Sequence, residues 1–203
     1  MFKVISFIMF GFLAACASPT PSNDYTVILD SSLSTETKVQ ATLAAMEWET
    51  ILDGKLSIHV ELGHCSPPSG FDGVVEYGLG IDAKTICVVA STAAYVDSNA
   101  QADPNYEILG FTLRLADIDS ATIYLPMDRD AKESYASMVQ IIAHEVGHAM
   151  GMFHTQSGTI MCFATYCASK VPTCDDQAQW LSIRGMFDIS ASCPVGGNYT
   201  LEH

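Results

Sequence analysis

The sequence predicts one α+β domain with an irregular, cysteine-rich C-terminal part. A chain of 203 residues, 49% hydrophobic and 16% charged, can bury one substantial core, and these figures exclude a disordered chain. A strand pattern is followed by a helical pattern, several more strand patterns and two further helical segments. Four of the seven cysteines lie after residue 160, where no regular periodicity is present.

The first helix is predicted over residues 34–52, after a β-rich run at residues 25–30. Ser34 is a suitable N-cap, and Gly54 ends the helix because glycine tolerates a left-handed backbone. Apolar side chains recur at helical spacing, at Val39, Leu43, Met46 and Ile51.

The next strand is predicted over residues 55–62, where apolar and polar side chains alternate. The apolar face carries Leu56, Ile58, Val60 and Leu62. His59 points to the other face, so we expect it to be a surface residue and not a metal ligand.

Further strands and two helices complete the predicted order. A loop rich in Gly, Pro and Ser covers residues 63–80. Strands are then expected at residues 85–90, 109–115 and 121–125. A helix follows at about residues 131–150, with Asp130 and Glu133 spaced as a capping box, and a last helix lies near residues 175–187.

The N-terminus has the pattern of an export signal. Lys3 precedes an apolar run at residues 4–13 that is too short to span a bilayer comfortably. The sequence LAAC that ends at Cys16 resembles the lipobox of bacterial lipoproteins, whose cysteine is acylated and becomes the first mature residue. The alternative, an ordinary cleaved signal with an unrelated cysteine, stays open.

This signal sets the expected boundaries and location. We expect a lipoprotein signal peptide at residues 1–15 and a tether at residues 16–24. Acyl chains on Cys16 would anchor the protein to a membrane. By analogy with Gram-negative lipoproteins, Ala17 in place of Asp implies the outer membrane.

The net charge argues against a nucleic-acid partner. Nine Lys and Arg against 23 Asp and Glu leave a formal charge of −14. Such a charge repels phosphate backbones. The acidic surface serves solubility, and we expect a monomer.

Six cysteines remain after Cys16, and an even number in an exported chain predicts disulfides. We pair Cys65 with Cys87. The other four are expected to pair among themselves: Cys162, Cys167, Cys174 and Cys193. A structural zinc site built from these four is the alternative, although they lack the paired CxxC spacing that such sites usually have.

The sequence HEVGHAMGMFH at residues 144–154 predicts a metal centre. His144 and His148 are four residues apart on a helix and can offer nitrogens to one ion. Glu145 is one step around the helix, so it can reach a water on the metal and act as general base.

His154 is the expected third ligand, and it requires a break in the helix. A continued helix would carry it about 15 Å along the axis from His144. Gly151 supplies the break because it tolerates a left-handed turn. Three imidazoles leave a fourth position for water, as in catalytic zinc sites.

These residues resemble the motif HExxHxxGxxH of the metzincin metallopeptidases. Their further mark, a methionine turn that forms an apolar floor beneath the metal, matches residues 157–161 and would make Met161 the floor residue. The resemblance implies an α+β fold: a twisted, mostly parallel five-stranded sheet with two long helices and a small, irregular, disulfide-rich C-terminal subdomain. The catalytic domain would cover residues 25–200, with an upper part at 25–151 and a lower part at 152–200.

The residue after the third histidine distinguishes metzincin branches. Thr155 is closest to the serine of matrixins. Cys162 departs from the usual Tyr or Ser after the methionine, and the nearest tyrosine is Tyr166. For Tyr166, packing in the core or a loop is favoured over contact with the metal or substrate.

The resemblance implies a zinc endopeptidase with one catalytic Zn²⁺ and a peptide or protein substrate. In metzincins the substrate lies antiparallel to the edge strand of the sheet, and residues 120–125, ended by Pro126, are the expected edge. The alternative is a surface zinc-binding or adhesin-like protein without proteolytic activity. Glu145 favours the enzyme, since a scaffold needs the ligands but not the base.

Overall fold

The computed structural model describes residues 23–65, 84–100, 108–115, 119–128, 137–155, 158–162 and 169–186. Within these ranges the strands are β1 (Asp24–Asp30), β2 (Ser57–Gly63), β3 (Thr85–Ser91), β4 (Phe111–Leu115) and β5 (Ser120–Pro126). The helices are α1 (Thr35–Leu52), α2 (Ala93–Asn99), α3 (Met138–Ala149) and α4 (Cys174–Ile183).

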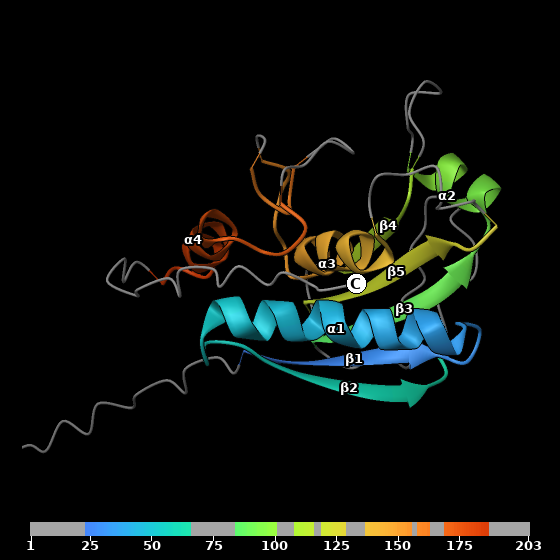
Figure 1. Cartoon of the computed structure of the whole chain (residues 1–203), viewed down its shortest axis with the longest axis horizontal. Coiled ribbons are helices and arrows are strands. Elements are labelled where there is room, and N and C mark those ends of the chain that lie inside the picture. Colours follow the sequence, from blue (N-terminus) through green and yellow to red (C-terminus); the bar gives the residue numbers. More distant parts are fainter. Residues whose placement is uncertain are drawn as a thin grey trace, which may run out of the picture.

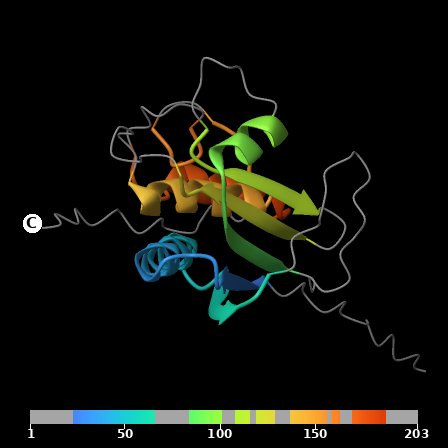
Figure 2. The same ribbon diagram turned by 90° about the vertical axis from the view of Figure 1, so that its right-hand side faces the viewer.

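The five strands form one twisted sheet in the order β2-β1-β3-β5-β4 (Figure 2). β1 pairs in parallel with β2 and with β3, and β3 pairs in parallel with β5. β4 alone runs antiparallel, against β5. The predicted α+β fold, with a mostly parallel five-stranded sheet and two long helices, is confirmed.

The predicted edge strand is wrong. Residues 120–125 belong to β5, which lies between β3 and β4 and is buried along its whole length. The edge is β4. The strand patterns of the two segments do not differ enough to show which one has a neighbour on both sides, because that depends on pairing with distant residues.

Helices α1 and α3 lie side by side on one face of the sheet (Figure 1). Trp48, at 0% exposure, joins them: its Nε1–H donates a 2.8 Å hydrogen bond to the carbonyl oxygen of Ala143 on α3. Such a bond satisfies the buried indole donor and ties α1 to the helix that carries the histidines.

The buried face of α1 is not the predicted one. Ile51 is buried, but Val39, Leu43 and Met46 are 55%, 46% and 53% exposed. The buried stripe instead carries small side chains and Trp48: Thr37, Ala41, Ala44, Ala45, Trp48, Ile51 and Leu52. Small residues let the helix approach the sheet and α3 closely, so this face is buried although Val39, Leu43 and Met46 are larger than the alanines.

The opposite face of the sheet carries a smaller cluster under α2. It consists of Cys65, Cys87, Val89, Val96 and Tyr124, with Phe111 and Leu113 of β4 packed against it. Cys65 and Cys87 form the predicted disulfide. Because Cys87 is in β3, this bond fixes the end of β2 to the middle of the sheet.

Most predicted element boundaries agree with the structure, but the start of α3 does not. Ser34 caps α1 by accepting from Thr37 N–H, and the chain turns at Asp53 and Gly54, both in left-handed conformations. α3 begins at Met138, and Ser137 is its N-cap. The predicted start near residue 131 is therefore wrong for the helix that carries the histidines.

Several predictions fall outside the described residues. They concern Cys16, Asp130, Glu133, Tyr166, Cys167 and Cys193. Among the residues that are described, Cys162 and Cys174 each take part in a disulfide bond. This contradicts a structural zinc site built from all four late cysteines. No helix in the described part of the chain is long and apolar enough to cross a membrane.

Candidate metal centre

Helix α3 presents His144 and His148 on one face, one turn apart. Each ring is oriented by a backbone carbonyl: the Nδ1–H of His144 donates to Ile160 O at 2.8 Å, and that of His148 donates to Met152 O at 2.9 Å. A carbonyl oxygen can only accept, so both hydrogens are on Nδ1 and both Nε2 atoms carry a free lone pair.

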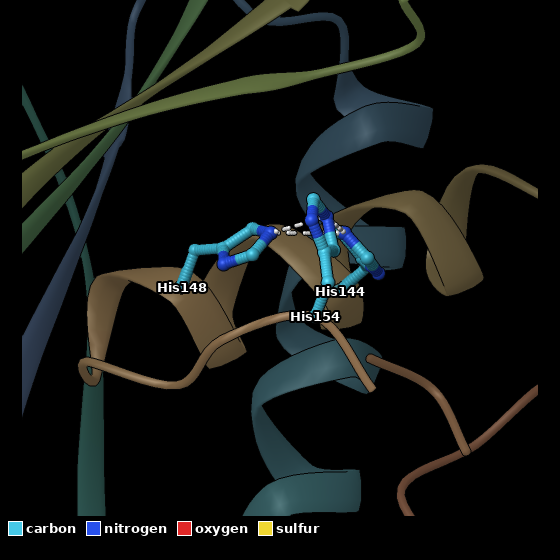
Figure 3. A group of neighbouring side chains, drawn as sticks. All are labelled: His144, His148 and His154. Carbon is cyan, nitrogen blue, oxygen red and sulfur yellow. Dashed lines mark hydrogen bonds between the residues drawn. The ribbon is translucent and has the colours of Figure 1, made fainter. Parts of the chain in front are cut away.

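The chain leaves α3 by a turn at Gly151, which has a φ of +92°. Glycine adopts this left-handed conformation without steric cost. The turn returns the chain beneath the helix and brings His154 against the other two rings (Figure 3). The sequence prediction that Gly151 breaks the helix ahead of His154 agrees with this geometry.

The three Nε2 atoms converge on one point. The distances between them are 3.2 Å for His144 and His154, 3.1 Å for His144 and His148, and 3.0 Å for His148 and His154. A tetrahedral zinc site with Zn–N bonds of about 2.0–2.1 Å requires nitrogens about 3.3 Å apart. Lone pairs this close repel one another unless a cation lies between them. The donor set therefore fits Zn²⁺, and among the described residues the group has three ligands.

Burial lowers the pKa of all three histidines. For His144, burial is the only cause that lowers the pKa. For His148 and His154, the neighbouring imidazole rings lower the pKa as well, and the pKa of His154 falls to about 4. The imidazoles are thus neutral near pH 7, which is the form that binds a metal.

Glu145 lies beside the histidines but points toward strand β4. Its side chain is buried, and its Oε2 accepts a 2.6 Å hydrogen bond from the hydroxyl of Thr112. Gly110 lies against the same side chain, where a Cβ would come within 2.8 Å of the Glu145 Cγ. Burial raises the pKa of this carboxyl group.

Met161 is fully buried and packs against α3 at Gly147. A Cβ at Gly147, between the two helical histidines, would overlap the Met161 sulfur and lie 3.0 Å from Trp48 Cζ2. The glycine therefore allows Met161 and Trp48 to pack directly against α3 between the two histidine positions.

The methionine turn is also joined to the segment after His154. Thr155 N–H donates to Met161 O at 2.8 Å, and the Thr155 and Thr159 hydroxyls are hydrogen-bonded to each other. Thr155 is thus a structural link between the third histidine and the methionine turn.

Asp176 fixes the methionine turn from α4, and sequence reasoning missed it. Its carboxylate is 0% exposed and accepts from the backbone N–H of Ile160 at 3.0 Å and of Met161 at 3.3 Å. It also accepts from Thr173 as part of a capping box. The spacing of Thr173 and Asp176 was the available signal, but a capping box predicts a helix start and not a contact with a distant turn.

A charged cluster holds the C-terminal end of α3. Arg114 Nε donates to Ala149 O, and Arg184 Nη2 donates to Met150 O, both at 3.2 Å. The two guanidinium groups share the Asp119 carboxylate, at 2.5 Å and 2.7 Å. Cations at a helix C-terminus are favourable, and here they brace the point where the chain turns toward His154.

A comparison with known protein families agrees with this site. A family model described as Matrixin matches residues 51–181, a range that includes α3, all three histidines and the methionine turn. Among solved structures, a zinc-dependent peptidase from Methanocorpusculum labreanum is 15% identical, with a TM-score of 0.46, over 76% of this chain and 99% of that chain. A search of curated proteins finds no match.

Proposed function

Because the chain belongs to the matrixin family of metallopeptidases, we propose that it is a zinc endopeptidase in which Glu145 is the general base. His144, His148 and His154 would hold one ion. The observation that carries the proposal is the convergence of three Nε2 atoms within 3.0–3.2 Å of one another, with a buried carboxylate on the adjacent helical position. Zn²⁺ bound there would polarise the scissile carbonyl and lower the pKa of a water molecule.

Glu145 performs the proton transfers in this proposal. As a carboxylate it takes a proton from the attacking water, and as a carboxylic acid it passes that proton to the leaving amine. Its burial supports this role, since a raised pKa brings the proton affinity of the carboxyl group closer to the working pH.

Strand β4 is the proposed docking site for an extended peptide. Its residues pair with β5 on one side, and it is the last strand in the sheet order. A peptide that adds to such an edge forms main-chain hydrogen bonds, which tolerate many side chains. This arrangement suits cleavage within a protein chain.

We also propose that the enzyme is an exported lipoprotein. The support is the sequence LAAC that ends at Cys16, which follows an apolar run of signal-peptide length. Acylated Cys16 would anchor the protein to the outer membrane, with residues 16–24 as tether.

The function is tested by incubating the mature protein with casein, with and without a chelator. Wild type is expected to cleave casein and to stop when the metal is removed. Glu145→Ala should retain about one zinc per chain, since Glu145 is not a ligand, and lose a factor of about 10² to 10⁴ in rate. His148→Ala should lower both zinc content and rate.

Two outcomes would contradict the enzyme proposal. Equal cleavage by wild type and Glu145→Ala would remove the general base from the mechanism. If neither protein cleaves a panel of unfolded substrates while both hold zinc, the site serves the alternative, a surface zinc-binding or adhesin-like function.

A further inference from the structure

The Glu145 carboxylate is held by strand β4, and we propose that Thr112 is a positioning residue for this carboxylate. The inference rests on the proposed function, in which Glu145 is the general base. Thr112 Oγ1 lies 2.6 Å from Glu145 Oε2 and 3.1 Å from the Glu145 carbonyl oxygen. The single hydroxyl proton goes to the closer, charged acceptor, because hydrogen bonds to a carboxylate are the stronger ones.

Gly110 completes the contact. Residues 110 and 112 are two apart on an extended segment, so both face α3. A Cβ at position 110 would lie 2.8 Å from Glu145 Cγ and 2.9 Å from Oε1. The glycine therefore leaves room for the glutamate side chain, while Thr112 binds one of its two oxygens.

Proton transfer requires a carboxylate of fixed orientation. Among the described residues, Thr112 is the hydrogen-bond partner of the Glu145 carboxylate, through Oε2 alone. This bond limits rotation of the carboxylate and leaves Oε1 for the proton that is taken up and released. Displacement of a catalytic group by about 1 Å can reduce a rate by about 100-fold, so a single hydrogen bond at this place has a large effect.

Thr112 also connects the base to the proposed substrate strand. Its backbone is in β4, paired with Ile123 of β5, and β4 is the edge to which the peptide would add. The same residue thus contributes main chain to the docking edge and a hydroxyl to the general base. The side chain, and not the main chain, is expected to affect the chemical step.

The test compares Thr112→Val, which removes the hydroxyl but keeps the shape, with Thr112→Ser, which keeps the hydroxyl. Thr122→Val is the matched control. Thr122 is buried in the neighbouring strand β5, opposite Leu113, and faces the other side of the sheet. For each protein, kcat and KM on a peptide, zinc content, melting temperature and the crystallographic position of Glu145 are measured.

Thr112→Val is expected to lower kcat by about 10-fold to 100-fold, with KM and zinc content unchanged, as for loss of a hydrogen bond to a charged group. The Glu145 carboxylate should be displaced in its crystal structure. Thr112→Ser should restore most of kcat, and Thr122→Val should match wild type. An unchanged kcat in Thr112→Val, equal losses in the Ser and Val variants, or an unmoved carboxylate would each overturn the proposal.

A double variant separates this inference from the proposed function. In a Glu145→Gln background, Thr112→Val should cause no further loss, because the group that Thr112 positions no longer acts as a base. If Glu145→Gln retains full activity, the proposed function fails. If Glu145→Gln is inactive while Thr112→Val alone is fully active, only the role of Thr112 fails.

Discussion

The Asp176 carboxylate accepts a 3.0 Å hydrogen bond from the backbone N–H of Ile160, whose carbonyl oxygen in turn accepts from His144 Nδ1. One buried side chain on α4 therefore reaches the His144 ring through the two peptide groups that flank Ile160. Groups that orient a metal ligand by accepting a hydrogen bond from it typically contribute a factor of about 10 to 100 in metal affinity.

Asp176→Asn should weaken zinc binding by about 10-fold to 100-fold, because the amide cannot accept from all the N–H groups that face it. The melting temperature should also fall. Zinc affinity is measured by competition with a chromophoric chelator. Asp175→Asn, the exposed neighbour in the first turn of α4, is the matched control and should behave as wild type. Equal zinc affinity in the two variants would show that the methionine turn does not depend on Asp176.

Gly151→Ala should lower both stability and zinc affinity. At a φ of +92° an alanine is strained by about 1–2 kcal/mol, and its Cβ would lie 3.2 Å from Arg114 Cζ. The control is Gly54→Ala, which has a similar φ of +72° but no atom within 4 Å of the added Cβ. Chemical unfolding should show a similar loss of stability from backbone strain in both variants. Zinc titration should show a loss of zinc affinity in Gly151→Ala alone. A normal zinc affinity in Gly151→Ala would contradict the role of this turn.

Asp30 should make the stability pH-dependent in acid. Burial opposes its ionisation, but hydrogen bonds from Ser32 and Cys65 and the nearby His64 lower its pKa to about 2, from an ordinary value of 3.8. A depressed folded-state pKa favours the ionised form in the fold, so this stabilisation is present above pH 3.8 and is lost as the pH falls toward about 2.

Urea unfolding of wild type and Asp30→Asn across this range measures the effect. The difference in unfolding free energy between them should be constant above pH 3.8 and should shrink as the pH approaches about 2. A difference that does not change with pH would mean that Asp30 has the same pKa in the folded and unfolded chains.

Cys16→Ser should release the protein from the membrane fraction, because the acylated side chain is lost. Ala17→Ser, the neighbouring substitution, should leave it bound. Cell fractionation with labelled fatty acid distinguishes the two. Sedimentation of Cys16→Ser with the membranes would contradict the lipoprotein proposal.

The motif at residues 144–154 could be interpreted from sequence because its spacing is local. Helix geometry alone places His144 and His148 on one face, and a glycine at 151 alone permits the turn toward His154. The caps at Ser34 and Gly54 could be predicted for the same reason, since each depends on residues within one helical turn.

The tertiary structure decided which surfaces meet. Val39, Leu43 and Met46 recur at helical spacing, but Trp48 and the alanines of α1 are buried because α3 and the sheet lie on their side. β5 and β4 have similar strand patterns, and only pairing with distant β3 makes β5 internal. Likewise, Thr112 and Asp176 reach the site across 33 and 16 positions of sequence. The sequence by itself determined the three candidate metal ligands and the local turn that brings them together. The edge strand and the partners that hold the site depend on long-range packing, which local spacing does not encode.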